Sequence, residues 1–184
     1  MPINVLGMIG VAPPPDAATV HIVGGGIDRD YIKAFTQAHE TSGFDAILIG
    51  HSSSSADGFG IAQYAATHSE RVNILLAHRP GFASPTQAAR RVATLDNLIE
   101  GRLWLHIITG GVDADQRRDG DFTPHDERYE RTHGGVGRSG RAAGLGRVAL
   151  VLAMALTSPI LVTLCLPVLL RPVAGSDTGQ VSGR

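Results

Sequence analysis

Four short apolar runs alternate with helix-like segments over the first part of the chain, and this alternation restricts the fold more than any other feature. The runs occupy residues 3–9, 44–50, 72–77 and 103–108. Apolar runs of this length are typical of strands in a sheet that helices cover. Strands that alternate with helices predict right-handed crossovers and a parallel sheet, so the expected fold class is α/β.

The segments between these runs carry signals for helices. Residues 28–41 repeat apolar side chains at helical spacing, with Asp28 as the expected N-cap, and residues 57–68 resemble a second helix. Ser84 and Pro85 begin a third helix, because serine caps a helix and proline suits its first turn. Its apolar face is expected to consist of Ala88, Val92, Leu95 and Leu98. A polar loop at 110–122 and a short helix at 124–131 follow.

Two architectures fit this order of elements: an open doubly wound sheet, or part of a (β/α) barrel. The periodicity of the sequence does not separate them. Four β/α units would make half of an eightfold barrel, which typically needs about 250 residues.

Composition excludes several classes of protein. The net charge of −1 gives no basic excess of the kind that nucleic-acid binders carry. Cys165 is the only cysteine, so neither an internal disulfide nor a cysteine-based zinc site can form. The histidines and carboxylates lack metal-site spacing, so no metal is expected. The first residues lack the pattern of a secretory signal, which predicts a cytoplasmic location.

The character of the sequence changes after residue 132. Residues 133–147 are rich in glycine and arginine and are expected to form a linker. Residues 148–170 contain no charge and are predicted to form a hydrophobic helical tail, long enough to cross a bilayer, which needs about 20 apolar residues. Residues 171–184 are expected to be disordered. The predicted domain therefore ends at residue 132.

Two explanations of the tail compete. In one, residues 148–170 insert into a membrane and tether the domain to it. In the other, the reading frame changed near residue 132 and the tail is a chance translation. The second is favoured, because Lys33 is the only lysine and the bias towards arginine fits GC-rich DNA.

Several short motifs between residues 72 and 110 occur in a fixed order. They are the strand end Ala77-His78-Arg79-Pro80, then Ser84-Pro85-Thr86, Ala88-Ala89-Arg90, Ala93-Thr94-Leu95-Asp96, Gly101-Arg102 and His106-Ile107-Ile108-Thr109-Gly110. A further motif, residues 125–130, follows Asp119-Gly120. In order and spacing, residues 3–132 resemble the luciferase-like flavin-dependent monooxygenases, especially the alkanesulfonate monooxygenase branch. The resemblance selects the barrel, and the expected fold is an incomplete (β/α)8 TIM barrel.

The resemblance implies a flavoprotein oxidoreductase. The family uses reduced FMN, supplied by a partner flavin reductase, and O2 to oxidise a small organic substrate such as an alkanesulfonate, at the carboxyl ends of the barrel strands. No catalytic residue is assigned. The residues expected to bind the cofactor are Ser55, Arg79, His106, Thr109, His125 and Tyr129.

All of these residues except Thr109 have an alternative role. The imidazole of His106 could be a hydrogen-bonded core group, and Arg79 could form a structural ion pair instead of meeting an anion. His125 and Tyr129 share one helix face, suited to a flavin phosphate, or form a polar exposed surface. Ser55 stands where the alkanesulfonate branch has a cysteine, so any thiol function is lost, and it could belong to a plain polar loop.

An incomplete barrel leaves its first and fourth strands with unpaired edges, which invite association with other chains. Pairing of two copies would close it, so a homo-oligomer is one expectation. Activity of this chain is predicted to be weak or absent. The alternatives to an enzyme are a non-catalytic gene remnant and a membrane-tethered interaction protein.

Overall fold

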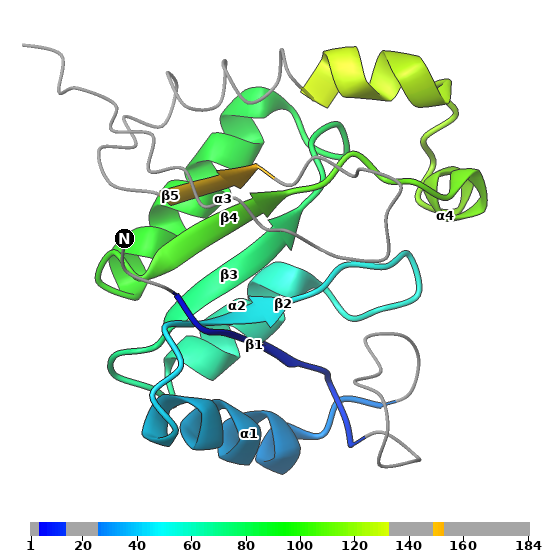
Figure 1. Ribbon diagram of the computed structural model, residues 1–184. Helices are drawn as coiled ribbons and strands as arrows, with labels where there is room; N and C mark the ends of the chain where they lie inside the picture. Colours follow the sequence, from blue (N-terminus) through cyan, green and yellow to red (C-terminus); the bar gives the residue numbers. More distant parts are fainter. Residues whose placement is uncertain (1–3, 14–25, 133–148, 153–184) are drawn as a thin grey trace, which may run out of the picture.

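The computed structural model describes residues 4–13, 26–132 and 149–152 (Figure 1). All strands in these residues belong to one parallel sheet, in the order β1-β2-β3-β4-β5. The strands are β1 (Leu6–Ile9), β2 (Ala46–Ile49), β3 (Asn73–His78), β4 (Leu103–Ile107) and β5 (Ala149–Leu152). The four strands predicted from the apolar runs are confirmed; β1, β2 and β4 are shorter than their runs, and β3 is shifted by one residue.

Helices connect the strands, and the N-caps of α1 and α3 are Asp28 and Ser84, as the sequence predicts. The helices are α1 (Arg29–Thr41), α2 (Gly58–Ala66), α3 (Pro85–Leu98) and α4 (Asp113–Arg118), and residues 125–132 are also helical. The side chains of Asp28, Asp57 and Ser84 each accept a hydrogen bond from a backbone N–H in the first turn. The polar loop predicted at 110–122 is wrong in part, because α4 lies within it.

The strand order decides between the two architectures. Neighbouring strands in the sheet are also neighbours in the sequence, so each right-handed crossover returns on the same side of the sheet. Figure 1 shows α1, α2 and α3 on one face, where they contact β1, β2, β3 and β4. A doubly wound sheet would reverse its strand order and carry helices on both faces. The sheet is therefore a segment of barrel wall.

The two faces of the sheet differ in their packing. Alternate strand residues point towards the helices and form the main core, where Ile47, Ile74 and Leu103 are fully buried. The strand residues that point away from the helices form a smaller cluster on the inner face of the sheet. It comprises the buried Ala46 and Leu75 and the partly buried Leu6, Leu48 and Trp104. In a complete barrel this inner face would line the interior.

One residue of the predicted apolar face of α3 is exposed instead of buried. Ala88, Val92 and Leu95 are buried, as expected. Leu98 is 63% exposed, because it lies at the end of α3 on the rim of a hollow between α2 and α3.

The predicted hydrophobic helical tail is wrong where the structure describes it. Residues 149–152 form β5, which pairs in parallel with β4 along Trp104–Ile107. A short apolar run suits a buried strand as well as a helix, and pairing here satisfies backbone groups on the edge of β4. The fourth strand is therefore not an unpaired edge. The predicted linker 133–147, residues 153–170 and the predicted disordered tail 171–184 lie outside the described residues. Within the described ranges, no helix combines the length and apolarity needed to span a membrane.

Candidate binding site at the carboxyl-terminal edge of the sheet

Parallel strands bring the loops that follow them to one edge of the sheet, and polar side chains from three of these loops meet there. His51 follows β2, Arg79 follows β3 and Asp119 follows α4. Asp119 Oδ2 lies 3.5 Å from Arg79 Nη1 and 3.7 Å from His51 Nε2. The carboxylate thus links segments that are far apart in the sequence.

Arg79 is a buried cation with spare hydrogen-bonding capacity. The residue is 6% exposed, and its guanidinium carbon lies 5.4 Å from the ring centroid of Phe82. Burial lowers the pKa of Arg79, and the nearby Asp119 opposes that shift. Neither Nε nor Nη1 has a hydrogen-bond partner among the described residues. Because a buried charge needs more compensation than one carboxylate at 3.5 Å, the guanidinium is suited to a further anionic group.

His51 lies beside this cation and is a neutral group at neutral pH. Its ring stacks on Phe82 with centroids 6.4 Å apart. Burial, and next the charge of Arg79, lower the pKa of His51. Its Nε2 atom is buried and, within the described part of the chain, makes no hydrogen bond. The imidazole therefore adds a neutral donor or acceptor beside the guanidinium.

The serine loop after β2 is held by its own hydrogen bonds. Ser55 Oγ donates to Ser52 O at 2.8 Å and accepts from Ser52 N at 3.1 Å. Ser53 Oγ donates to Asp115 Oδ1 at 2.9 Å, which ties the loop to α4. The hydroxyl of Ser55 closes a turn, in line with the polar-loop alternative, and a cofactor contact at Ser55 stays a prediction.

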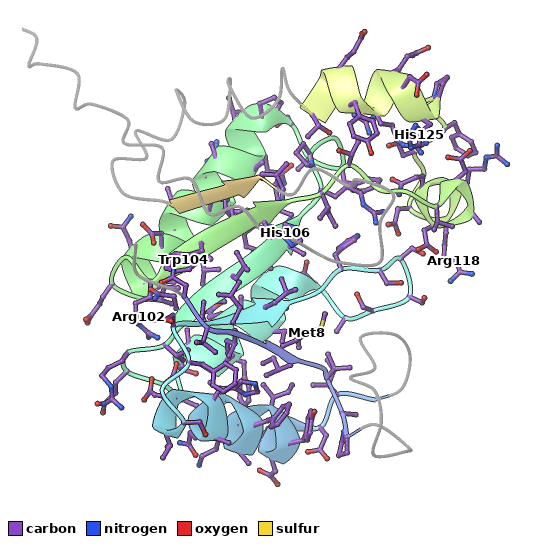
Figure 2. The ribbon with its side chains drawn as sticks, in the orientation of Figure 1. Met8, Arg102, Trp104, His106, Arg118 and His125 are labelled. Carbon is purple, nitrogen blue, oxygen red and sulfur yellow. The ribbon has the colours of Figure 1, made fainter. Side chains whose placement is uncertain are left out.

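His106 lies on the inner face of β4, near its carboxyl end (Figure 2). It pairs in register with Ala77 of β3 and Val151 of β5. Both ring nitrogens are buried, and neither has a hydrogen-bond partner among the described residues. Burial lowers the pKa of His106, so the ring is neutral at pH 7. The alternative of a hydrogen-bonded core histidine therefore finds no partner in the part of the chain that the structure describes.

Thr109 follows the end of β4 and precedes a tight turn. Gly110 adopts a φ of 88°, and a Cβ added there would collide with the side-chain amide of Gln116. Glycine at this position lets α4 pack closely against the strand end. Thr109 thereby lies at the same edge as Arg79 and His51.

His125 and Tyr129 lie together but apart from the other predicted residues. Their ring centroids are 5.1 Å apart on the helical segment 125–132, and both side chains are about half exposed. His125 Nδ1 lies 3.1 Å from Asp126 Oδ1. Figure 2 shows His125 beyond the carboxyl end of β4, whereas His106 lies on the strand itself. Among the described residues, no hydrogen bond or ring contact joins this pair to Arg79 or His106.

Two arginines that sequence reasoning missed, the buried Arg128 and the partly buried Arg131, hold this helical segment in place. Arg128 is 1% exposed and donates to Thr123 O, Gly110 O and Asp113 Oδ1, the last at 2.7 Å. Arg131 forms an ion pair with the buried carboxylate of Asp121. Their partners lie in the stretch that was interpreted as a polar loop. The only signal in the sequence was an excess of Asp over Arg in that loop.

His51 and Asp119 were also missed as site residues, although His51 directly follows the predicted strand 44–50 and Asp119 precedes a recognised motif. A hollow of about 430 Å³ is lined by His78, residues 80–85, Gln87, Ala88 and Arg131, and neither His51 nor Asp119 lines it. Within the described ranges, no group of three or more His, Cys, Asp or Glu side chains could hold a metal ion.

Comparisons with known proteins agree with this barrel wall. A family model described as luciferase-like monooxygenase matches residues 3–133. The monooxygenase RslO1 from Streptomyces bottropensis superposes with a TM-score of 0.63 and 17% identity, over 82% of this chain and 54% of that one. EDTA monooxygenase from Chelativorans sp. BNC1 gives a TM-score of 0.59 and 16% identity, over 74% of this chain and 35% of that one.

A third solved structure contains a flavin. It is the oxygenating constituent of 3,6-diketocamphane monooxygenase from Pseudomonas putida, a type II Baeyer-Villiger monooxygenase in complex with FMN. Its TM-score is 0.56 at 16% identity, over 72% of this chain and 38% of that one. At such identities these structures establish the fold alone. The chain spans between 30% and 35% of the length of the long-chain alkane and EDTA monooxygenases that it resembles.

Proposed function

Because the chain belongs to the luciferase-like monooxygenase family, we propose that it binds FMN at the carboxyl-terminal edge of its sheet and serves the oxygenation of a small organic substrate. The observation that carries the proposal is the set of buried polar atoms without partners at this edge, on His106 and Arg79. Buried polar groups in proteins are almost always paired, so such a set favours a ligand that completes the pairing. The FMN complex of the oxygenating constituent of 3,6-diketocamphane monooxygenase supports the choice of flavin.

The residues present fit a flavin in both charge and polarity. His106 and Thr109 would face the polar edge of the flavin ring, because they lie at the carboxyl end of β4. His125 and Tyr129 offer an N–H and an O–H to phosphate oxygens. Ser55 is the weakest member of the set, because its hydroxyl already closes its own turn. When bound, reduced FMN supplies the electrons with which O2 is activated.

The protein side chains have their own tasks in this proposal. His106 is neutral, so one ring nitrogen donates a hydrogen bond and the other accepts one, which fixes the orientation of a group that carries both functions. Arg79 offers Nε and Nη1 to an anion, which is either the flavin phosphate or the acidic head of a substrate such as an alkanesulfonate. Trp104 and Leu48 line the inner face below the site and keep water from it.

Turnover by this chain alone is proposed to be slow. The described sheet has five strands, whereas an eightfold barrel encloses its active site with loops from eight. Flavin bound here would therefore be less shielded from water than in a closed barrel. The partner flavin reductase, the use of O2 and a closing second copy are parts of the same proposal.

The proposal is tested by titrating FMN into the purified full-length chain and following the quenching of flavin fluorescence. We expect saturable binding with a Kd on the order of tens of micromolar. The variants His106→Phe and Arg79→Met should weaken it, whereas Arg118→Met, a change at an exposed arginine of α4, should not. Absence of saturable binding by the unaltered chain would refute the proposal and leave the non-catalytic alternative.

A further inference from the structure

The inner face of the sheet carries apolar side chains that no described helix covers. Leu6, Leu48 and Trp104 are only partly buried there, although they surround the buried Ala46 and Leu75. The helices α1, α2 and α3 all lie on the opposite face (Figure 1). An apolar surface of this kind requires a cover, since leaving it in water is unfavourable in proportion to its area.

The chain itself supplies a segment of suitable chemistry and position. β5 runs parallel to β4 and ends at Leu152, in register with Ile107, so the chain leaves β5 at the carboxyl-terminal edge of the sheet. The next 18 residues, 153–170, contain no charged side chain. Extended, they reach about 60 Å, whereas strands 4.8 Å apart make this sheet about 20 Å wide. The segment is long enough to cross the face completely.

The absence of charged side chains from the segment favours the inner face over the outer one. A helix on the outside of a barrel wall needs a polar side towards water, as α1 has in its charged residues Arg29, Asp30 and Lys33. Residues 153–170 offer no such side. Pro159 and Pro167 also interrupt any long regular helix.

We infer that residues 153–170 fold back across the inner face of the sheet and pack on the apolar cluster of Leu6, Leu48 and Trp104. The segment then covers, within the same chain, the surface that the remaining strands of a barrel would enclose. The inference concerns packing and does not depend on flavin binding.

Disulfide trapping tests this packing in the full-length chain, because Cys165 is its only cysteine and lies in the segment. Leu48→Cys places a thiol on the inner face, and Leu98→Cys places one on the outer surface. Leu98 is 63% exposed and nearer to Cys165 in the sequence, so random encounters favour this control. We expect Leu48→Cys to form the intramolecular disulfide about tenfold faster, because packing raises the effective concentration of the two thiols.

A second measurement uses the only tryptophan, Trp104, and does not alter the sheet. Leu164→Asp places a charge in the segment and should detach it, which shifts the emission of Trp104 to the red and increases its quenching by acrylamide. Ser176→Asp adds the same charge outside the segment and should leave both unchanged. The two experiments remain informative separately, so a Leu48→Cys variant that fails to fold does not end the test.

Three results would overturn the inference. Equal or faster trapping of Leu98→Cys would place the segment on the outside or leave it unattached. Disulfide-linked dimers of Leu48→Cys would show that a second copy covers the face. Sedimentation of the unaltered chain with phospholipid vesicles, with no intramolecular disulfide in Leu48→Cys, would show that the segment enters a bilayer instead.

Discussion

The two edges of the sheet use similar polar residues in opposite ways. At the amino-terminal edge, the carboxylate of Glu40 accepts hydrogen bonds from the backbone N–H groups of residues 70, 71 and 72. Arg102 donates to the carbonyls of Ala66, Ser69 and Val72 and to the hydroxyl of Ser69. These groups join loops to strands and are satisfied within the protein.

The carboxyl-terminal edge leaves comparable groups without partners. At this edge and on the attached helical segment 125–132, the buried polar atoms that lack a hydrogen bond lie on His51, Arg79, His106, Gln116, Arg128, Arg131 and Thr132. Outside this edge and its attached helix, the described residues contain one further case, Thr36 in α1. In (β/α) barrels the amino-terminal face maintains stability and the carboxyl-terminal face carries the active site. The difference between the two edges in hydrogen-bond pairing follows the same direction as that division.

The largest expected effect concerns the stability of the amino-terminal edge. Arg102→Met removes all four hydrogen bonds of the guanidinium and leaves carbonyl groups without a donor. We expect the free energy of unfolding to fall by about 4 kcal/mol, since bonds to a charged group contribute about 1.5–3 kcal/mol each and do not add fully. Urea denaturation measures the change. Arg118→Met, at the opposite edge (Figure 2), should change the free energy of unfolding by no more than about 0.5 kcal/mol. An equal loss of stability in both variants would contradict the difference between the two edges.

The second effect is a dependence of stability on pH. His78 ends β3 on the helix-covered side, beside the ring of Phe59, and burial lowers its pKa to about 4. The unfolded chain binds the proton more readily, at a pKa of about 6.5. Stability should therefore fall as the pH drops from about 6.5 to about 4, by about 3 kcal/mol, and the contribution is fully lost below that range.

His78→Gln should flatten this part of the profile, measured by urea denaturation at a series of pH values. His125→Gln, a change on the half-exposed helical segment, is the matched control and should keep the slope. If the slope survives in His78→Gln, the buried histidine is not its source.

The third effect separates binding from stability at the carboxyl-terminal edge. His106→Phe removes two buried nitrogens that have no partner, so folding stability should stay the same or rise slightly. Under the proposed function the same change removes hydrogen bonds to the flavin and weakens FMN binding about tenfold, equivalent to about 1.4 kcal/mol. Thermal denaturation and FMN titration measure the two quantities. A clear loss of stability with unchanged FMN affinity would assign His106 to the core.

The smallest effect is expected at the amino-terminal edge, where a change should lower stability and leave FMN binding unchanged. Glu40→Gln weakens the three hydrogen bonds that the carboxylate accepts from the backbone, because a neutral amide is the poorer acceptor. We expect a loss of about 1 kcal/mol in the free energy of unfolding and no change in FMN affinity. Those hydrogen bonds also hold the pKa of Glu40 below its usual value, against burial, so its contribution disappears as the pH falls through that lowered pKa.

Local signals made most of the fold predictable. Asp28 and Ser84 cap helices in the way that their positions indicate, and the apolar runs become strands. The helix α4 was missed because Asp113–Arg118 has no apolar period. β5 was misassigned because Ala149–Leu152 is apolar in a context that suits a helix equally, and only its pairing with β4 decides.

The candidate site was predictable only in outline. Strand ends placed Arg79, His106 and Thr109 at one edge, since parallel strands end together. The ion pairs Arg79–Asp119 and Arg128–Asp113 were not predicted, because their members are far apart in the sequence and no local pattern indicates such a pair. His125 and Tyr129 were correctly placed side by side on a helix, but their relation to His106 depends on the whole fold.

The most direct test of the contrast between the edges is side-chain NMR of the histidine and arginine nitrogens during an FMN titration. The account predicts saturable shifts at His106 and Arg79, whose buried nitrogens gain partners, while Arg102 stays unchanged. Saturable shifts at Arg102 with none at His106 and Arg79, or no saturable shift at either edge, would contradict it.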